Sequence, residues 1–212
     1  MIPSVLLNPK EKDLVLDVCA SPGAKTSHLA ELMKNKGLII ANDYKYDRIK
    51  ALSINLQRCG ILNTIITLME GKRFSRSEIK FDKILVDAPC SGTGAIRKSL
   101  KTLKMWNPNM FKRLSGIQRQ LISVAFERLK ENGTLVYSTC SIAPEENEAV
   151  VDFLLKKYDN AKLEQINLPI KKSNIILEYE KELYNKEIKK CLRIWPQDNN
   201  TEGFFVAKIK KE

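Results

Sequence analysis

Short apolar segments alternate with segments of helical periodicity along the first two-thirds of the chain. The apolar segments lack polar alternation, as strands do when helices cover both faces of a parallel sheet. The segments between them carry apolar residues every three or four positions. The sequence therefore predicts an α/β fold with a doubly wound, mostly parallel sheet. The predicted strands are 14–18, 37–43, 63–69, 81–89 and 134–138, and the predicted helices are 24–35, 44–60 and 109–133.

The last third of the chain is less regular. A helix is predicted over 145–158 and a closing strand over 203–209. Residues 159–190 are rich in Lys, Glu, Asn and Ile, and we expect a variable excursion with a charged helix at 177–190. The sequence shows no internal repeat and no linker. A length of 212 residues suits one domain with a sizeable core, so a single domain over 1–212 is expected.

The chain is strongly basic, with 36 Lys and Arg against 25 Asp and Glu and a net charge of +11. Such a balance attracts polyanions and favours a nucleic-acid partner. A lysine-rich genome or heat tolerance gives the same composition, so charge alone leaves the choice open. No apolar run approaches the roughly 18 residues of a membrane span, and no signal segment opens the chain. We therefore expect a cytoplasmic protein.

The cysteines are five in number and scattered, without C-x-x-C spacing. This pattern argues against a disulfide framework and against a zinc site. We expect reduced thiols and no metal. The five are Cys19, Cys59, Cys90, Cys140 and Cys191.

Small residues form the turn at 19–25, between the first predicted strand and the first helix. Such residues let the backbone approach a ligand at a helix N-terminus. The turn is not a Walker phosphate loop, because Cys19 and Ala24 stand where that loop has glycines. Asp43 ends the second predicted strand, about 20 residues after Gly23, where a carboxylate can accept hydrogen bonds from ribose hydroxyls. The alternative role for Asp43 is a helix cap.

Two further carboxylates, Glu70 and Asp87, follow the third and fourth predicted strands. The carboxyl ends of parallel strands form the ligand-binding edge of an open α/β sheet. Three carboxylates at that edge argue against a phosphate-rich ligand. They favour a cationic ligand with an adenosine part.

Two cysteines stand just past strand ends, in the segments DAPCSGTG (Cys90) and STCSIAPEE (Cys140). In a doubly wound sheet the fourth strand lies beside the first and the fifth beside the fourth, about 4.8 Å apart. The two thiols are therefore expected next to one another at the same edge. Inert core cysteines are the alternative, but the polar turns favour functional thiols.

The chain resembles the Sun/RsmB-type family of RNA cytosine carbon-5 methyltransferases, which use S-adenosylmethionine. The resemblance spans nearly the whole chain, and the Pro-Cys and Thr-Cys pair is its most specific part. It implies a Rossmann-like class I methyltransferase fold and a tRNA or rRNA substrate, and we expect a monomer. The matching segments are DVCASPGAKTSHLA, ANDYKYDRIKAL, ILVDAPCSGTG, LVYSTCSIAPEENE and RIWPQDNNTEGFFVAKI.

The resemblance also implies roles for individual residues. By resemblance, Cys140 matches the family's nucleophile and Cys90 matches the thiol that assists release of the methylated base. Asp87 matches the group that holds the edge of the cytosine ring. Lys25 is our candidate for a cation that lowers the thiol pKa, while His28 is expected to be structural. The implied cofactor-contacting positions are Cys19, Ala20, Ser21, Pro22, Gly23, Ala24, Lys25, Asp43, Arg48, Glu70 and Asp87.

The sequence departs from the family pattern at three places. Ala24 stands where a second glycine is usual, which costs nothing if it is the first residue of a helix. The segment WPQDNN lacks a histidine that is frequent there. The chain begins at MIPSVLLNP, which matches what directly follows an upstream family segment, so we expect a catalytic core alone.

Two alternatives to this function stay open. A DNA cytosine methyltransferase would use the Pro-Cys thiol as its nucleophile. An RNA-binding assembly factor would keep the fold without turnover.

RNA contacts are expected from the basic segment 96–108. Its cations can neutralise phosphates, and Trp106 either stacks on a base or packs in the core. The cations are Arg97, Lys98, Lys101 and Lys104.

Overall fold

The computed structural model describes residues 1–107 and 109–212, without the side chains of Lys101 and Met105. The chain divides into two compact units. The first unit comprises Met1–Asp87, Ser123–Val136 and Lys211, and the second Ala88–Ile122, Tyr137–Lys210 and Glu212.

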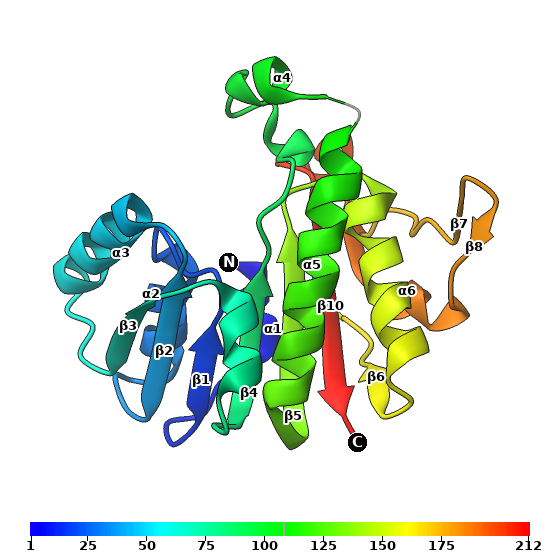
Figure 1. Ribbon diagram of the computed structural model, residues 1–212. Helices are drawn as coiled ribbons and strands as arrows, with labels where there is room; N and C mark the ends of the chain where they lie inside the picture. The colour runs from blue at the N-terminus through cyan, green and yellow to red at the C-terminus, as the bar shows by residue number, and fades with distance from the viewer. Residues whose placement is uncertain (108) are drawn as a thin grey trace. The chain divides into compact units, whose positions relative to one another are not determined.

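The first unit is built on a parallel sheet in the strand order β3-β2-β1-β4-β5. Strand β1 lies between β2 and β4 and is parallel to both, with Leu16 opposite Ile40 on one side and Ile84 on the other. This order confirms the predicted doubly wound arrangement, and Figure 1 shows β3, β2, β1 and β4 side by side. The strands are β1 (Leu14–Asp17), β2 (Leu38–Asp43), β3 (Thr64–Leu68), β4 (Phe81–Asp87) and β5 (Leu129–Thr139), whose residues to Val136 belong here.

Helices of the first unit pack their apolar stripes on this sheet. Helix α2 buries Leu29 and Ala30, and α3 buries Leu52 and Leu56, at the spacing of one helix face. Val15, Ile39 and Ile84 in β1, β2 and β4 are fully buried, which explains the apolar runs of these strands, whereas Ile65 and Leu68 of β3 are about half exposed. The elements are α1 (Ile2–Leu7), α2 (Ala24–Leu32), α3 (Tyr46–Arg58) and the 3-10 helix η1 (Gly71–Arg76).

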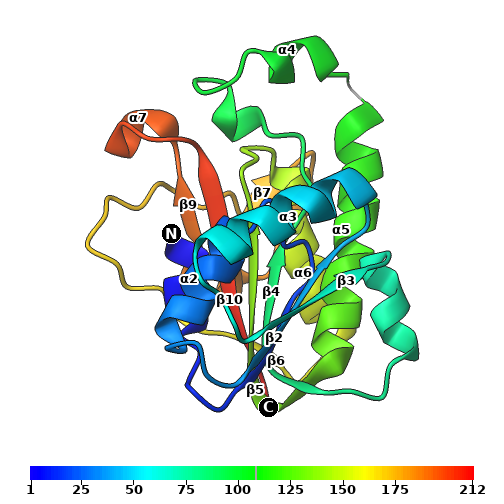
Figure 2. The same cartoon turned by 90° about the vertical axis from the view of Figure 1, so that its left-hand side faces the viewer.

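The second unit contains the strand order β5-β10-β6, with β9 antiparallel to β10. The closing strand and the helix after the second cysteine are present as predicted. Figure 2 shows β9 and β10 running beside one another. The elements are η2 (Thr93–Ala95), α4 (Lys101–Met105), α5 (Asn109–Arg128), whose residues to Ile122 belong here, η3 (Pro144–Glu146), α6 (Glu148–Lys157), β6 (Ala161–Leu163), β9 (Leu192–Ile194), α7 (Pro196–Asn199) and β10 (Phe204–Lys211), whose residues to Lys210 belong here.

The charged helix predicted at 177–190 is wrong. The segment holds a small antiparallel hairpin of β7 (Glu178–Tyr179) and β8 (Glu182–Leu183), labelled in Figure 1, and then the 3-10 helix η4 (Lys186–Lys190). The two turn residues, Glu180 and Lys181, have φ values of 49° and 69°. These left-handed conformations end any right-handed helix.

The long helix predicted over 109–133 ends early, because α5 stops at Arg128 and β5 begins at Leu129. Leu129 is fully buried, and Gly133 lies so close to it that a β-carbon there would be 2.7 Å from the Leu129 side chain. Asn132 also has a φ of 60°. The chain therefore bends at 129–133 instead of continuing the helix.

No helix in the described ranges 1–107 and 109–212 combines the length and apolar character that a membrane crossing needs.

Candidate active site

The turn after β1 is fixed by its backbone in the first unit. Gly23 is the N-cap of α2 with a φ of 103°, a conformation that glycine adopts without strain. Its amide donates to the Ala20 carbonyl at 2.8 Å, and the Ala20 amide donates to the Asn42 carbonyl at 2.8 Å. Ala24 is the first residue of α2, so alanine is accommodated there as expected.

Asp43 ends β2 and is only 2% exposed. Its Oδ2 accepts hydrogen bonds from the Ser21 amide at 3.3 Å and from Arg48 Nε at 3.0 Å. Its Oδ1 accepts from the Tyr44 amide at 2.9 Å. Arg48 Nη2 donates to the Ser21 carbonyl at 2.8 Å, and Ser21 Oγ returns a bond to the Arg48 carbonyl. The carboxylate therefore holds the turn, while Lys45 rather than Asp43 is the N-cap of α3.

Lys25 and Asp87 form an ion pair in the first unit, with Nζ 2.6 Å from Oδ2. Both side chains are about a quarter exposed, at 25% and 28%. Asp87 is the last residue of β4, and Lys25 lies in the first turn of α2. Two of the predicted site residues are thus in direct contact.

A third acidic residue, Asp17 at the end of β1, was missed by the sequence reasoning. It is buried and accepts a hydrogen bond from Thr26 Oγ1 at 2.8 Å. Burial raises its pKa to about 7; the bond from Thr26 opposes the rise, the charge of Asp87 adds to it and that of Lys25 opposes it. The only sequence signal was an aspartate closing an otherwise apolar run, LVLDV.

Glu70 follows β3 and is about half exposed. The amide of the preceding residue, Met69, donates to the Asp43 carbonyl at 3.1 Å, which fixes where the chain leaves β3. The Glu70 carboxylate pairs with Lys72 Nζ at 2.8 Å. The hydrogen bond and the charge of Lys72 lower the pKa of Glu70 below its ordinary value.

The two predicted thiols are adjacent in the second unit, with the Sγ atoms of Cys90 and Cys140 3.2 Å apart. This confirms that they lie next to one another. The neighbouring Cys140 thiol and burial raise the pKa of Cys90 well above its ordinary value, and the charge of Glu146 adds to the rise. Cys90 therefore keeps its proton at neutral pH.

Two glycines allow the thiol turns to pack closely. The Gly94 amide donates to the Cys140 carbonyl, and the Gly203 amide donates to the Gly94 carbonyl, both at 2.9 Å. A β-carbon on Gly94 would lie 2.3 Å from the Gly203 carbonyl oxygen and 2.8 Å from that of Cys140. Only glycine fits at Gly94 without moving backbone.

A buried ion pair ties the RIWP segment to the turn after Cys140. Arg193 and Glu148 are 1% and 0% exposed, and Arg193 Nε donates to Glu148 Oε1 at 2.8 Å. Arg193 Nη1 also donates to the Ile142 carbonyl at 2.9 Å. The sequence reasoning matched both segments to the family but missed this contact.

The basic segment presents Arg97, Lys98 and Lys104 as exposed side chains. Trp106 is 51% exposed, so it does not pack in the core. Lys98 pairs loosely with Glu202 at 3.5 Å. The side chain of Lys101, also predicted to contact RNA, lies outside the described residues.

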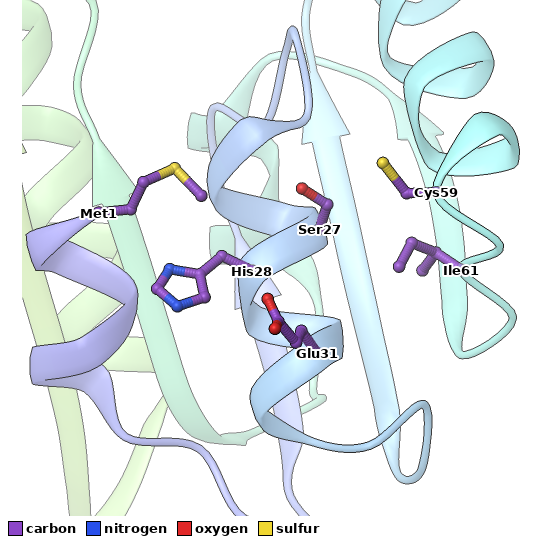
Figure 3. Close-up of a pocket in the computed structure, with 6 residues that line it drawn as sticks. All are labelled: Met1, Ser27, His28, Glu31, Cys59 and Ile61. Atoms are coloured by element: carbon purple, nitrogen blue, oxygen red, sulfur yellow. The ribbon is translucent and has the colours of Figure 1, made fainter.

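A pocket of about 440 Å³ opens in the first unit beside α2. Figure 3 shows Ser27, His28 and Glu31 projecting from one helix, with Cys59 and Ile61 beyond them and Met1 beside His28. None of the predicted catalytic or cofactor-contacting residues lines it. Across the described part of the chain, no group of three or more His, Cys, Asp or Glu side chains is placed to hold a metal ion.

The sheet order and the turn after β1 define a Rossmann-like α/β fold, and the solved structures that match it place it in the methyltransferase class. The crystal structure of NSun6 from Pyrococcus horikoshii with SFG matches with a TM-score of 0.82 and 35% identity, over 99% of this chain and 52% of that one. More particularly, the chain belongs to the family described as 16S rRNA methyltransferase RsmB/F, whose profile matches residues 4–210.

Curated relatives agree with this family. A tRNA (cytosine(49)-C(5))-methyltransferase of Pyrococcus abyssi is 49% identical over 100% of this chain and 68% of its own length. A ribosomal RNA small subunit methyltransferase F of Shewanella amazonensis is 44% identical over 100% of this chain and 44% of its own length. The chain therefore spans about two-thirds of the first relative and less than half of the second.

Proposed function

We propose that this protein transfers a methyl group from S-adenosylmethionine to carbon-5 of cytosine in tRNA or rRNA, through a covalent adduct on Cys140. The observation that carries the proposal is the contact of the Cys90 and Cys140 sulfur atoms at 3.2 Å. The names of the relatives and the net charge of +11 support an RNA substrate.

The chemistry requires a thiolate because carbon-5 of cytosine is a weak nucleophile. Addition of the Cys140 sulfur to carbon-6 makes the ring an enamine, which can attack an electrophilic methyl group. S-adenosylmethionine supplies that methyl group on a sulfonium centre. A base then removes the carbon-5 proton, the carbon–sulfur bond breaks, and its electron pair returns to the Cys140 sulfur.

In this proposal the Cys90 thiol assists the reaction of Cys140. Its raised pKa keeps the proton on Cys90 at neutral pH. The protonated thiol is placed to donate to the Cys140 sulfur at 3.2 Å. Such a bond favours the Cys140 thiolate both as nucleophile and as leaving group.

The Lys25–Asp87 ion pair has a positioning role in this proposal. We assign Asp87 to the cytosine ring edge, as the family resemblance implies. Lys25 was predicted to lower the thiol pKa, but its contact with Asp87 at 2.6 Å compensates much of its charge. The proposal therefore gives Lys25 the task of orienting the Asp87 carboxylate.

The residues of the first unit fit the cofactor. The turn at 19–25 packs so closely that a β-carbon on Gly23 would lie 3.0 Å from Leu52 Cδ1. Asp43 accepts hydrogen bonds from the Ser21, Tyr44 and Lys45 amides and from Arg48, which take up the roughly four acceptor positions of a carboxylate, so in this proposal Asp43 acts by fixing the turn at 19–25. The crystal structure of NSun6 with SFG supports a cofactor-like ligand in this family.

We further propose that residues 1–212 act as one catalytic domain, as a monomer in the cytoplasm. The five cysteines, which form no disulfide among the described residues, support a reducing compartment.

Incubation with S-adenosylmethionine labelled in its methyl group, and with total RNA or DNA, tests the proposal. Nucleoside analysis should find the label in 5-methylcytidine from RNA and none in DNA. Label in DNA would make the protein a DNA cytosine methyltransferase. Tight RNA binding without label would favour an assembly factor.

A further inference from the structure

The turns that carry the two thiols are both hydrogen-bonded to one buried carboxylate, that of Glu146. Its Oε1 accepts from the Ser91 amide at 2.9 Å, and its Oε2 accepts from Ser91 Oγ and Ser141 Oγ, each at 2.5 Å. Ser91 directly follows Cys90, and Ser141 directly follows Cys140. Glu146 is 0% exposed, and the two serines are 6% and 1% exposed.

Helix α5 completes the arrangement. Gln118 Nε2 donates to Glu146 Oε1 at 3.0 Å and to the Pro89 carbonyl at 2.9 Å. Pro89 directly precedes Cys90. One side of the Cys90 turn is thereby joined to the carboxylate through Gln118 and the other through Ser91.

The chemistry of a carboxylate suits this place better than that of a neutral side chain. The donors named above are neutral, so burying the charge costs free energy that a simple packing role does not require. An ionised carboxylate only accepts hydrogen bonds, which forces both serine hydroxyls to point at it. Ser141 Oγ is then left to accept from the Ala143 amide, at 3.0 Å. The directions of the bonds in both turns are therefore set by Glu146.

We propose that Glu146 is a positioning residue that holds the Cys90 and Cys140 turns at a fixed separation, so that both sulfurs act on one base. The inference rests on the proposed function for the base, but the separation of the sulfurs is a property of the folded protein alone. Glu146 touches neither reacting atom and acts through Ser91 and Ser141.

How readily the two thiols form a disulfide reports how closely their sulfur atoms are held. This measurement does not depend on methyl transfer. Glutathione disulfide oxidises the pair: one sulfur–sulfur bond forms, and the two electrons and two protons leave in two glutathione thiols. The sulfurs must move from 3.2 Å to about 2.05 Å, so a well-held pair has a high effective concentration. The intact chain is equilibrated in glutathione buffers, quenched with acid, and the Cys90–Cys140 peptide is quantified by mass spectrometry.

We expect Glu146→Ala to lower the effective concentration of the pair about tenfold or more and Glu146→Gln to lower it less, because glutamine keeps one acceptor oxygen. Glu145→Ala is the matched control, since that neighbour is half-buried and its side chain interacts with Tyr179. Glu146→Gln should also move the alkylation profile of Cys90 to lower pH, because the charge of Glu146 raises that thiol's pKa.

Two outcomes overturn the inference, and a third separates it from the proposed function. Unchanged disulfide formation in folded Glu146→Ala does so. If Glu146→Ala fails to fold, unchanged disulfide formation and alkylation in Glu146→Gln reduce Glu146 to a structural role. Loss of disulfide formation in a protein that methylates no RNA would support the inference while counting against the proposed function.

Discussion

The sulfur atoms of Cys90 and Cys140 are in contact, yet the proposed function gives the two thiols different roles. Without Cys140 there is no addition at carbon-6, so Cys140→Ala should abolish methyl transfer and form no covalent RNA adduct. Cys90→Ala should still add and methylate but release slowly, so an adduct should accumulate and survive denaturing gel electrophoresis. Cys59→Ala, which removes an exposed thiol, is the control.

The opposite pattern would contradict these roles. If Cys140→Ala traps RNA and Cys90→Ala is inactive without adduct, the nucleophile is Cys90, as in DNA cytosine methyltransferases. Turnover in wild type with no adduct in either variant would exclude the covalent route.

The buried Asp17 carboxyl makes stability depend on pH. Its pKa is raised from 3.8 to about 7, so between these values the unfolded chain loses a proton that the folded protein keeps. The free energy of unfolding therefore falls as pH rises through this window, by an amount on the order of 4 kcal/mol at most. In Asp17→Asn that fall should be absent.

Denaturant unfolding at pH 4.5 and 7.5 measures the effect. The exposed Asp159→Asn serves as control and should keep the wild-type difference. Equal pH dependence in wild type and Asp17→Asn would show that the carboxyl is ionised in the folded protein.

At the scale of elements, β1, β2 and β4 and the helices α2 and α3 could be predicted, because burial gives these segments clear apolar patterns, whereas the short helices α1 and η1 were not predicted. Val15, Leu16 and Ile84 are fully buried, and each falls in a predicted strand. The hairpin at 178–183 has no such apolar pattern, because it depends on two charged residues adopting positive φ. Charged composition alone does not separate a hairpin from a helix.

The candidate site was predicted unevenly for a related reason. The adjacency of the thiols followed from sheet topology, since both cysteines come just after strand ends. Glu146 and Asp17 were missed, because an acidic residue before a helix or after a strand usually faces solvent. Their hydrogen-bond partners come from other segments of the chain, Ser91 for Glu146 and Thr26 for Asp17.

The basic segment before α5 should govern the salt dependence of RNA binding. Lys98 and Lys104 are exposed, and the contact of Lys98 with Glu202 is too exposed to hold it firmly. Reversing both charges to Glu should flatten the slope of log affinity against log salt by about one unit for each phosphate that the protein no longer neutralises. Fluorescence anisotropy with labelled RNA gives the slope.

Reversal of Lys186 and Lys189, two exposed lysines elsewhere in the second unit, is the matched control. An equal change of slope in both double variants would mean that net charge, and not this segment, carries the binding.

For the whole molecule, cofactor binding should appear as thermal stabilisation. At about 100 times its dissociation constant, S-adenosylmethionine should add roughly 2.7 kcal/mol. For a chain of this length that corresponds to a rise in Tm of about 5–10 °C. Asp43→Ala should give a smaller rise, because the turn at 19–25 loses its carboxylate. No rise at millimolar concentration would remove the cofactor assignment.

Asp47→Ala is the control for that comparison, since its carboxylate is 95% exposed on α3. If Asp43→Ala and Asp47→Ala reduce the rise equally, the effect belongs to the loss of one negative charge and not to the turn.

The hydrogen bond from the Gly203 amide to the Gly94 carbonyl can form only late in synthesis, after Gly203 has been added to the chain. Cys140 leaves the ribosome well before Gly203, by roughly 3–13 seconds at ordinary elongation rates of about 5–20 residues per second. The turn at Gly94, whose amide donates to the Cys140 carbonyl, can gain its bond from Gly203 only after that delay. A nascent chain therefore carries both cysteines for several seconds before the hydrogen bond between Gly203 and Gly94 can form.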